Sequence, residues 1–246
     1  MKNCSFFLLA FVVLLAACAP QATATPASAT AVSATLPPDT PQPPTATPDT
    51  SITILDALDR DVTLPVPPQR IVLTGKALFM IADAAYIFPG AAEKIVGMGN
   101  AGQGSGNFIQ LIDPKYPEKQ NLDRDAGAEQ VAALQPDLVI LKSYLAESVG
   151  APIEALGIPV VYIDFETPEQ YQRDLAILGK VFDDEARAAE IAAFYQFKTD
   201  EIAKTVKDAP KPRVLMLSYN DKDGKVAFNV PPMNWLQTKM VEIAGG

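Results

Sequence analysis

The sequence contains no histidine among its 246 residues, and its only two cysteines are Cys4 and Cys18. Without histidine, Ser-His-Asp and Cys-His catalysis are excluded, and the commonest protein ligand of zinc, copper and nickel is missing. Basic residues are also in the minority, because 20 Lys plus Arg stand against 29 Asp plus Glu, for a formal net charge of -9. A surface of this sign repels nucleic-acid phosphates. We therefore expect no nucleic-acid partner, no catalytic residues, no metal site and no resident cofactor.

Both cysteines lie near the N-terminus, where the sequence has the pattern of an export signal. Lys2 supplies a positive charge, residues 6–17 form an apolar run, and Leu15-Ala16-Ala17-Cys18 has the composition of a lipoprotein cleavage site. The run is shorter than the about 20 residues that a membrane-spanning helix needs, which disfavours a signal anchor. We predict a signal peptide over residues 1–17 and acyl chains on Cys18 that hold the mature protein at a membrane.

Residues 18–50 consist almost entirely of Ala, Thr, Pro, Ser and Gln. Large apolar side chains are scarce there, so the segment cannot bury enough surface to offset the entropy lost on folding. Its prolines favour extended polyproline conformations. We predict a disordered, lipid-anchored tether that keeps the folded part of the chain outside the cytoplasm, in the periplasm or at the cell surface.

Residues 51–166 alternate between β-branched runs and helical segments, which predicts an α/β lobe. A mostly parallel sheet covered on both faces fits this alternation, and ligands of such sheets bind beyond the carboxyl ends of the strands. We expect a hairpin of residues 51–55 and 61–64, strands at 70–74, 94–96, 137–141 and 159–163, a helix at 77–88, a short helix after Ala128, and a helix that ends at Gly157.

Residues 167–209 change to a helical pattern. Thr167 and Pro168 have the types typical of a helix cap and first turn, and Asp183 or Asp184 caps a second helix that runs to Val206. Its apolar residues Ile191, Tyr195, Ile202 and Val206 fall on or near one face. A helix of this length spans about 30 Å and could brace two lobes.

Residues 210–246 return to a strand pattern and predict part of a second lobe. We expect strands at 213–219 and 225–228, a turn at 221–224, and a helix near 234–243. The apolar residues in this short segment are too few to close a core, because fragments below about 40 residues seldom fold alone.

From Ser51 onward the chain resembles the substrate-binding proteins of ABC importers for iron complexes, haem and cobalamin. Several stretches carry this resemblance through their order and spacing. They are Asp56-Ala57-Leu58-Asp59-Arg60-Asp61-Val62-Thr63-Leu64-Pro65 before Pro68-Gln69-Arg70-Ile71-Val72, then Lys94-Ile95-Val96-Gly97-Met98-Gly99, Glu129-Gln130-Val131-Ala132-Ala133-Leu134-Gln135-Pro136-Asp137-Leu138-Val139-Ile140, and Leu156-Gly157-Ile158-Pro159-Val160-Val161.

The resemblance implies a two-lobed periplasmic-binding-protein-like fold with a single long linking helix, small closure and a preformed cleft. It implies delivery of a small metal chelate to an ABC permease and its ATPase, with Glu129 matching a glutamate that docks on the permease. Glu129 would equally suit the first turn of a helix, where its charge favours the dipole.

Two departures from the family pattern stand out. Asp59 occupies a usual glycine position, which Asp tolerates in a left-handed turn. The family would also continue for most of another lobe after Gly246. We interpret the chain as a truncated or incomplete reading frame, or as a receptor interrupted in evolution, with an incomplete second lobe.

The ligand-binding residues should lie on loops that follow the strands. Lysines there could meet an anionic chelate and aromatic rings could stack on it, although loop lysines are often solvated and Phe108, Phe165 and Tyr219 would equally suit a core. Without histidine, bare zinc or manganese and histidine-ligated haem are disfavoured, which leaves siderophores, cobalamin and tyrosine-ligated haem. The candidates are Thr74, Lys76, Asn100, Phe108, Lys142, Tyr144, Phe165 and Glu166 from the first lobe, and Tyr219 and Asn220 from the second.

Two other functions remain open. Gly97-Met98-Gly99-Asn100-Ala101-Gly102 matches a dinucleotide-binding fingerprint. The glycine-rich residues behind it prolong a loop instead of opening a helix, and no acidic residue ends a second strand about 20 residues on. The other alternative is a surface lipoprotein that serves as a scaffold or sensor without a transport role.

Overall fold

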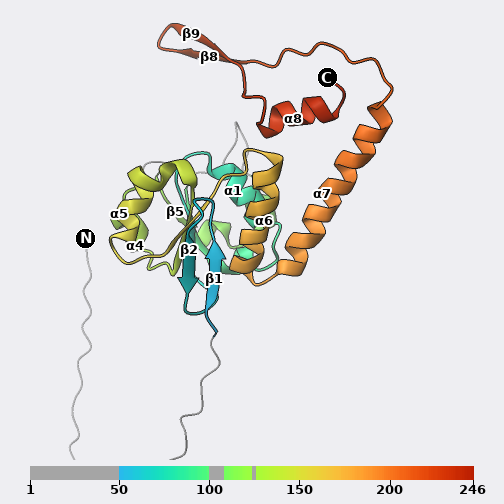
Figure 1. Cartoon of the computed structure of the whole chain (residues 1–246). Helices are drawn as coiled ribbons and strands as arrows, with labels where there is room; N and C mark the ends of the chain where they lie inside the picture. The colour runs from blue at the N-terminus through green and yellow to red at the C-terminus, as the bar shows by residue number, and fades with distance from the viewer. Residues whose placement is uncertain (1–49, 100–107, 124–125) are drawn as a thin grey trace, which may run out of the picture. The chain divides into compact units, whose positions relative to one another are not determined.

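The computed structural model describes residues 50–99, 108–123 and 126–246. They form an α/β lobe, a long helix and a C-terminal segment with one hairpin and one helix (Figure 1). The predicted signal peptide, Cys18, all of the predicted tether before residue 50, and Asn100 lie outside the described residues. Within the described ranges, no helix is both long and apolar enough to cross a bilayer.

The lobe is built on a five-stranded sheet in which every pair of neighbouring strands is parallel. The sheet order is β5-β4-β3-β6-β7, with β3 at the centre. Every residue of β3, β6 and β7 is buried, as expected for strands covered on both faces. The strands are β3 (Ile71–Leu73), β4 (Ile95–Met98), β5 (Gln120–Asn121), β6 (Leu138–Lys142) and β7 (Val160–Ile163).

Helices cover both faces of this sheet, and β7 shows how the alternation of side chains divides the core. Val161 and Ile163 pack on the face covered by α1 (Leu78–Ala85) and α6 (Pro168–Phe182), whereas Val160 and Tyr162 pack with Val131 and Ile153 on the opposite face. That second face is covered by α4 (Ala128–Ala132) and α5 (Ala151–Glu154). The predicted α/β fold with a parallel sheet is confirmed. The remaining short elements of the lobe are α2 (Ala91–Lys94), α3 (Ile109–Ile112), η1 (Tyr116–Glu118), η2 (Ser143–Leu145) and η3 (Ala146–Gly150).

An antiparallel hairpin, β1 (Ile52–Leu55) and β2 (Asp61–Leu64), precedes the sheet as predicted. Asp59 in its turn has a φ of 57°, the left-handed conformation that Asp tolerates.

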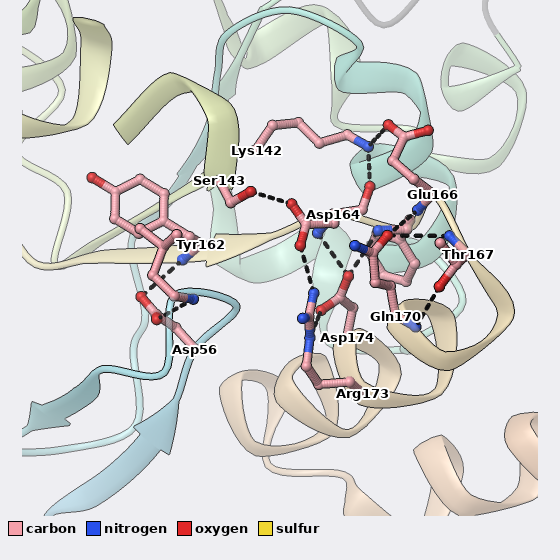
Figure 2. Close-up of polar contacts among 12 residues, drawn as sticks. Asp56, Lys142, Ser143, Tyr162, Asp164, Glu166, Thr167, Gln170, Arg173 and Asp174 are labelled. Atoms are coloured by element: carbon pink, nitrogen blue, oxygen red, sulfur yellow. Dashed lines mark hydrogen bonds and ion pairs between the residues drawn. The ribbon is translucent and has the colours of Figure 1, made fainter. Parts of the chain in front are cut away.

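The buried carboxylate of Asp56 orders this turn and attaches it to β7. It accepts hydrogen bonds from the amides of Leu58 and Arg60 at 2.9 and 3.2 Å, and from the Arg60 guanidinium at 2.7 Å. The Tyr162 amide donates to the same carboxylate at 3.4 Å (Figure 2), and the Ala57 amide donates to the Tyr162 carbonyl at 2.9 Å. The turn therefore covers the outer edge of β7.

Two helices follow the lobe. Thr167 and Gln170 form a capping box at the start of α6, as the Thr167-Pro168 sequence predicts. Of the two candidate caps for α7 (Glu185–Val206), Asp184 is the one that accepts a hydrogen bond from the Arg187 amide. The apolar face predicted for α7 is covered at its two ends more than in its middle, because Ile191 is buried and Val206 is half-buried, whereas Tyr195 and Ile202 are 44% and 46% exposed.

The C-terminal segment contains β8 (Ser218–Lys222), β9 (Lys225–Asn229) and α8 (Leu236–Ile243). The strand predicted at 213–219 begins only at Ser218, so the prediction was wrong for residues 213–217. Pairing explains the difference: β8 pairs with β9, and the ladder ends where Ser218 meets Asn229. Asp223 and Gly224 supply the two positive φ angles of a tight hairpin turn.

We predict that Asp56→Asn lowers the free energy of unfolding by about 3 kcal/mol, because it removes the buried charge that pairs with Arg60 and replaces one acceptor oxygen with an NH2 group that faces other N–H donors. Urea denaturation followed by circular dichroism measures the loss. The control, Asp61→Asn, changes an exposed aspartate of β2 and should alter stability by less than about 0.5 kcal/mol. Equal effects of the two substitutions would show that Asp56 does not anchor the hairpin.

Candidate functional site

The parallel strands place three chain segments at the carboxyl edge of the sheet. Gly75 and Lys76 follow β3, η2 and η3 follow β6, and residues 164–167 follow β7. This is the edge at which open α/β sheets bind ligands.

Lys142, the last residue of β6, is buried with no exposed surface. Its ammonium group donates to the Asp164 carbonyl and forms an ion pair with Glu166 at 2.7 Å (Figure 2). The prediction placed Lys142 on a loop where it could reach an anionic chelate. The structure corrects this placement, because the side chain ends inside the protein and holds the loop after β7.

A second set of charges fixes the same loop. The Asp174 carboxylate accepts hydrogen bonds from the amides of Asp164 and Phe165 at 2.7 and 2.8 Å, and Arg173 lies 2.8 Å away. Burial raises the pKa of Asp174, and these donors oppose the shift. The Asp164 carboxylate accepts a hydrogen bond from the Ser143 hydroxyl and forms an ion pair with Arg173 at 2.7 Å (Figure 2). The network joins the ends of β6 and β7 to α6.

Phe165 and Glu166 form the turn that this network holds. Phe165 has a φ of 59°, which is unfavourable for an aromatic residue, and its ring is buried, so its position fits the core alternative. The Glu166 amide donates to Gln170 at 3.0 Å, and the Glu166 carbonyl accepts from the Leu236 amide at 2.7 Å. Glu166 therefore belongs to the framework of this edge, with its side chain 27% exposed.

A pocket of about 450 Å³ lies at the same edge. Gly75 has a φ of 90°, and a Cβ at this position would approach Leu145 Cδ1 to 2.5 Å, so only glycine fits here. Among the described residues that line the pocket, Lys76 alone is charged. The lining residues are Gly75, Lys76, Ala126, Gly127, Ala128, Leu145, Ser148, Val149 and Pro152.

Of the predicted ligand-binding residues, Lys76 is the one found in the lining of this pocket. Thr74 is buried at the end of β3. Besides Lys142, Phe165 and Glu166, whose places are given above, the other candidates among the described residues are exposed: Phe108 precedes α3, Tyr144 lies in η2, and Tyr219 and Asn220 lie on β8.

The remaining lining residues were missed because they are Ala, Gly, Ser, Leu, Val and Pro, which carry no chemical signature. Their position offered a signal, since residues 143–152 directly follow a buried strand of the sheet. In the described part of the chain, no group of three or more Cys, Asp or Glu side chains is arranged to hold a metal ion.

Two other predicted sites can be located. Glu129 is exposed in the first turn of α4. Gly97 of the dinucleotide fingerprint is a residue of β4 paired with Gln120, and a Cβ there would approach Leu134 Cδ1 to 2.5 Å. Close packing accounts for this glycine without a bound pyrophosphate.

A comparison with protein families finds that residues 82–236 match the family described as periplasmic binding protein. No curated protein sequence matches the chain. Among solved structures, the TroA-like periplasmic binding protein FepB from Veillonella parvula is 25% identical, with a TM-score of 0.62; the match covers 79% of this chain and 61% of FepB.

Two further structures share the fold and contain ligands. The siderophore binding protein BauB, bound to two molecules of acinetobactin and ferric iron, is 20% identical with a TM-score of 0.59, over 80% of this chain and 66% of BauB. S. aureus IsdE complexed with heme is 23% identical with a TM-score of 0.55, over 72% of this chain and 63% of IsdE. The chain thus spans less than two thirds of the length of each of these proteins.

We predict that Lys142→Met lowers the free energy of unfolding by about 3 kcal/mol, because it removes a buried charge while its partners remain. Denaturant unfolding measures the change. Lys115→Met is the matched control, since Lys115 pairs with Glu93 in solvent and surface pairs contribute little. If Lys142→Met is as stable as this control, the buried ion pair does not hold the loop.

Proposed function

The chain belongs to the periplasmic binding protein family, and from this membership we propose that it is an extracytoplasmic solute-binding protein of an ABC importer. It captures a small metal chelate and delivers it to the permease and its ATPase. The observation that carries this proposal is the match over residues 82–236, which includes most of the sheet and the long helix.

The proposed ligand is an iron chelate, haem or cobalamin. The pocket at the carboxyl edge supports this class, because its apolar wall suits the body of a chelate and Lys76 supplies one positive charge. BauB and IsdE, which share the fold, were solved with ferric acinetobactin and with heme. Of the earlier candidates, Lys76 is the residue we propose to contact the ligand.

Membrane attachment is proposed from the sequence. Acyl chains on Cys18 and the Pro- and Thr-rich residues 18–50 would keep the lobe close to its permease. Glu129 is the proposed docking residue, and its exposure on α4 leaves it accessible to a basic permease surface.

Binding of defined chelates tests the proposed function. The chain is dialysed against a ferric catecholate siderophore, haemin or cyanocobalamin, and bound chelate is measured by absorption. We expect saturable binding of at least one probe. Lys76→Ala should lower the affinity for an anionic probe by about threefold to fivefold, since it removes one solvent-accessible positive charge.

The matched control is Lys204→Ala, which removes an exposed lysine in the last turn of α7. It should leave affinity unchanged. Failure of the unaltered chain to bind any of the three probes would contradict the proposed function and favour the scaffold or sensor alternative.

Lipid attachment has a separate test. Expressed with its signal sequence in a bacterium fed labelled palmitate, the chain should incorporate label and sediment with membranes. Cys18→Ala should abolish the labelling, whereas Cys4→Ala should not, because Cys4 lies within the predicted signal peptide. Label retained in Cys18→Ala would refute the predicted anchor.

A further inference from the structure

One wall of the pocket is formed by a π-helical turn, η3, together with Leu145 before it and Pro152 after it. Leu145, Ser148 and Val149 line the pocket from this wall. π-helical turns are rare and occur frequently at functional sites, because they displace side chains from the positions an α-helix gives them.

Gly150 ends this turn and packs directly on Tyr162 of β7. It is buried, and its φ of -66° is available to any residue, so conformation does not explain the glycine. The lack of space explains it, because a Cβ on Gly150 would lie 2.7 Å from Cζ and 2.9 Å from Cε1 of Tyr162. Any larger residue must move the turn away from the sheet.

Tyr162 cannot move aside. Its side chain has no exposed surface, and its residue is paired with Leu141 in the sheet. The Ala57 amide donates to its carbonyl at 2.9 Å, and the Arg60 guanidinium lies 4.4 Å from the centre of its ring. The tyrosine is therefore a rigid support beneath the turn.

The start of the wall is fixed as firmly as its end. Lys142 and Ser143 are bonded to Asp164, as described above, and Leu145 packs against Gly75 of the β3 loop. With both ends held, the turn has one position, in which Gly150 packs on Tyr162 of the sheet and Leu145, Ser148 and Val149 line the pocket. A ligand cannot push it towards β7, because close-packed interiors compress little.

We propose that the contact between Gly150 and Tyr162 sets the width of the pocket and so the size of chelate that it accepts. This inference rests on the proposed function and adds a size limit to it. Gly150 and Tyr162 act as positioning residues, because neither lines the pocket itself.

The inference predicts opposite effects of two substitutions. Gly150→Ala is expected to move the turn into the pocket. The ratio of the dissociation constant of a large chelate to that of a small one should then rise about tenfold or more. Tyr162→Leu leaves room beneath the turn and should shift the same ratio the other way. In the double variant the smaller support accepts the added methyl group, so the ratio should return towards that of the unaltered chain.

The experiment compares dissociation constants for haemin, the smaller probe, and cyanocobalamin, the larger, by equilibrium dialysis of the full chain and the three variants. Gly90→Ala is the matched control, because a Cβ on Gly90 meets only the distant end of Lys94 at 3.9 Å. It should not alter the ratio. Circular dichroism verifies folding, and Tyr162→Leu alone tests the proposal if Gly150→Ala does not fold.

If the unaltered chain binds only haemin, Tyr162→Leu is expected to gain binding of cyanocobalamin. If the unaltered chain binds only cyanocobalamin, Gly150→Ala is expected to lose this binding. Binding with a ratio that no folded variant changes would overturn the size limit and leave the proposed function intact. Binding of neither probe by the unaltered chain would overturn this inference, and the siderophore measurement would then decide the proposed function.

Discussion

The carboxyl edge of the sheet depends on the neutralisation of buried charge. The carboxylate of Asp174 accepts two consecutive backbone amides, and Lys142 closes the other side of the same loop through Asp164 and Glu166. Removing either side chain leaves a charge or a backbone amide without a partner in the protein interior, which lowers the stability of the fold. The left-handed Phe165 and the start of η2 are both held by this arrangement.

The pocket inherits its rigidity from that framework. Its walls are short connections with small side chains, which by themselves would not hold a shape. They are held because their ends are attached to the strands, at Gly75 after β3 and at Ser143 after β6. A site of this kind binds a ligand with little ordering cost, which is the benefit of a preorganised pocket.

The sequence predicts the lobe well because its signals are local. β-branched runs, the Thr167-Pro168 cap and the length of α7 each depend on neighbouring residues. Long-range effects were harder to predict. In the sequence, Lys142 follows an apolar strand and looks like a lysine on a loop. Only the pairing of β6 with β3 and β7 shows that it is buried. Likewise, residues 213–217 have the composition of a strand, but the β8–β9 ladder ends at Ser218. The pocket lining escaped prediction because small apolar residues acquire a role only through their place in the fold.

The topology of the sheet also has a kinetic consequence. The central strand β3 pairs with β6 through Ile71 and Leu138, and the turn before β2 is bonded to Tyr162, about a hundred residues further along the chain. Contacts between such distant segments form slowly, because the intervening chain must first lose its freedom. The attachment of the hairpin turn to Tyr162 therefore closes a much longer loop than the pairing of β6 with β7, and a newly made chain can complete this edge only after β7 has been added.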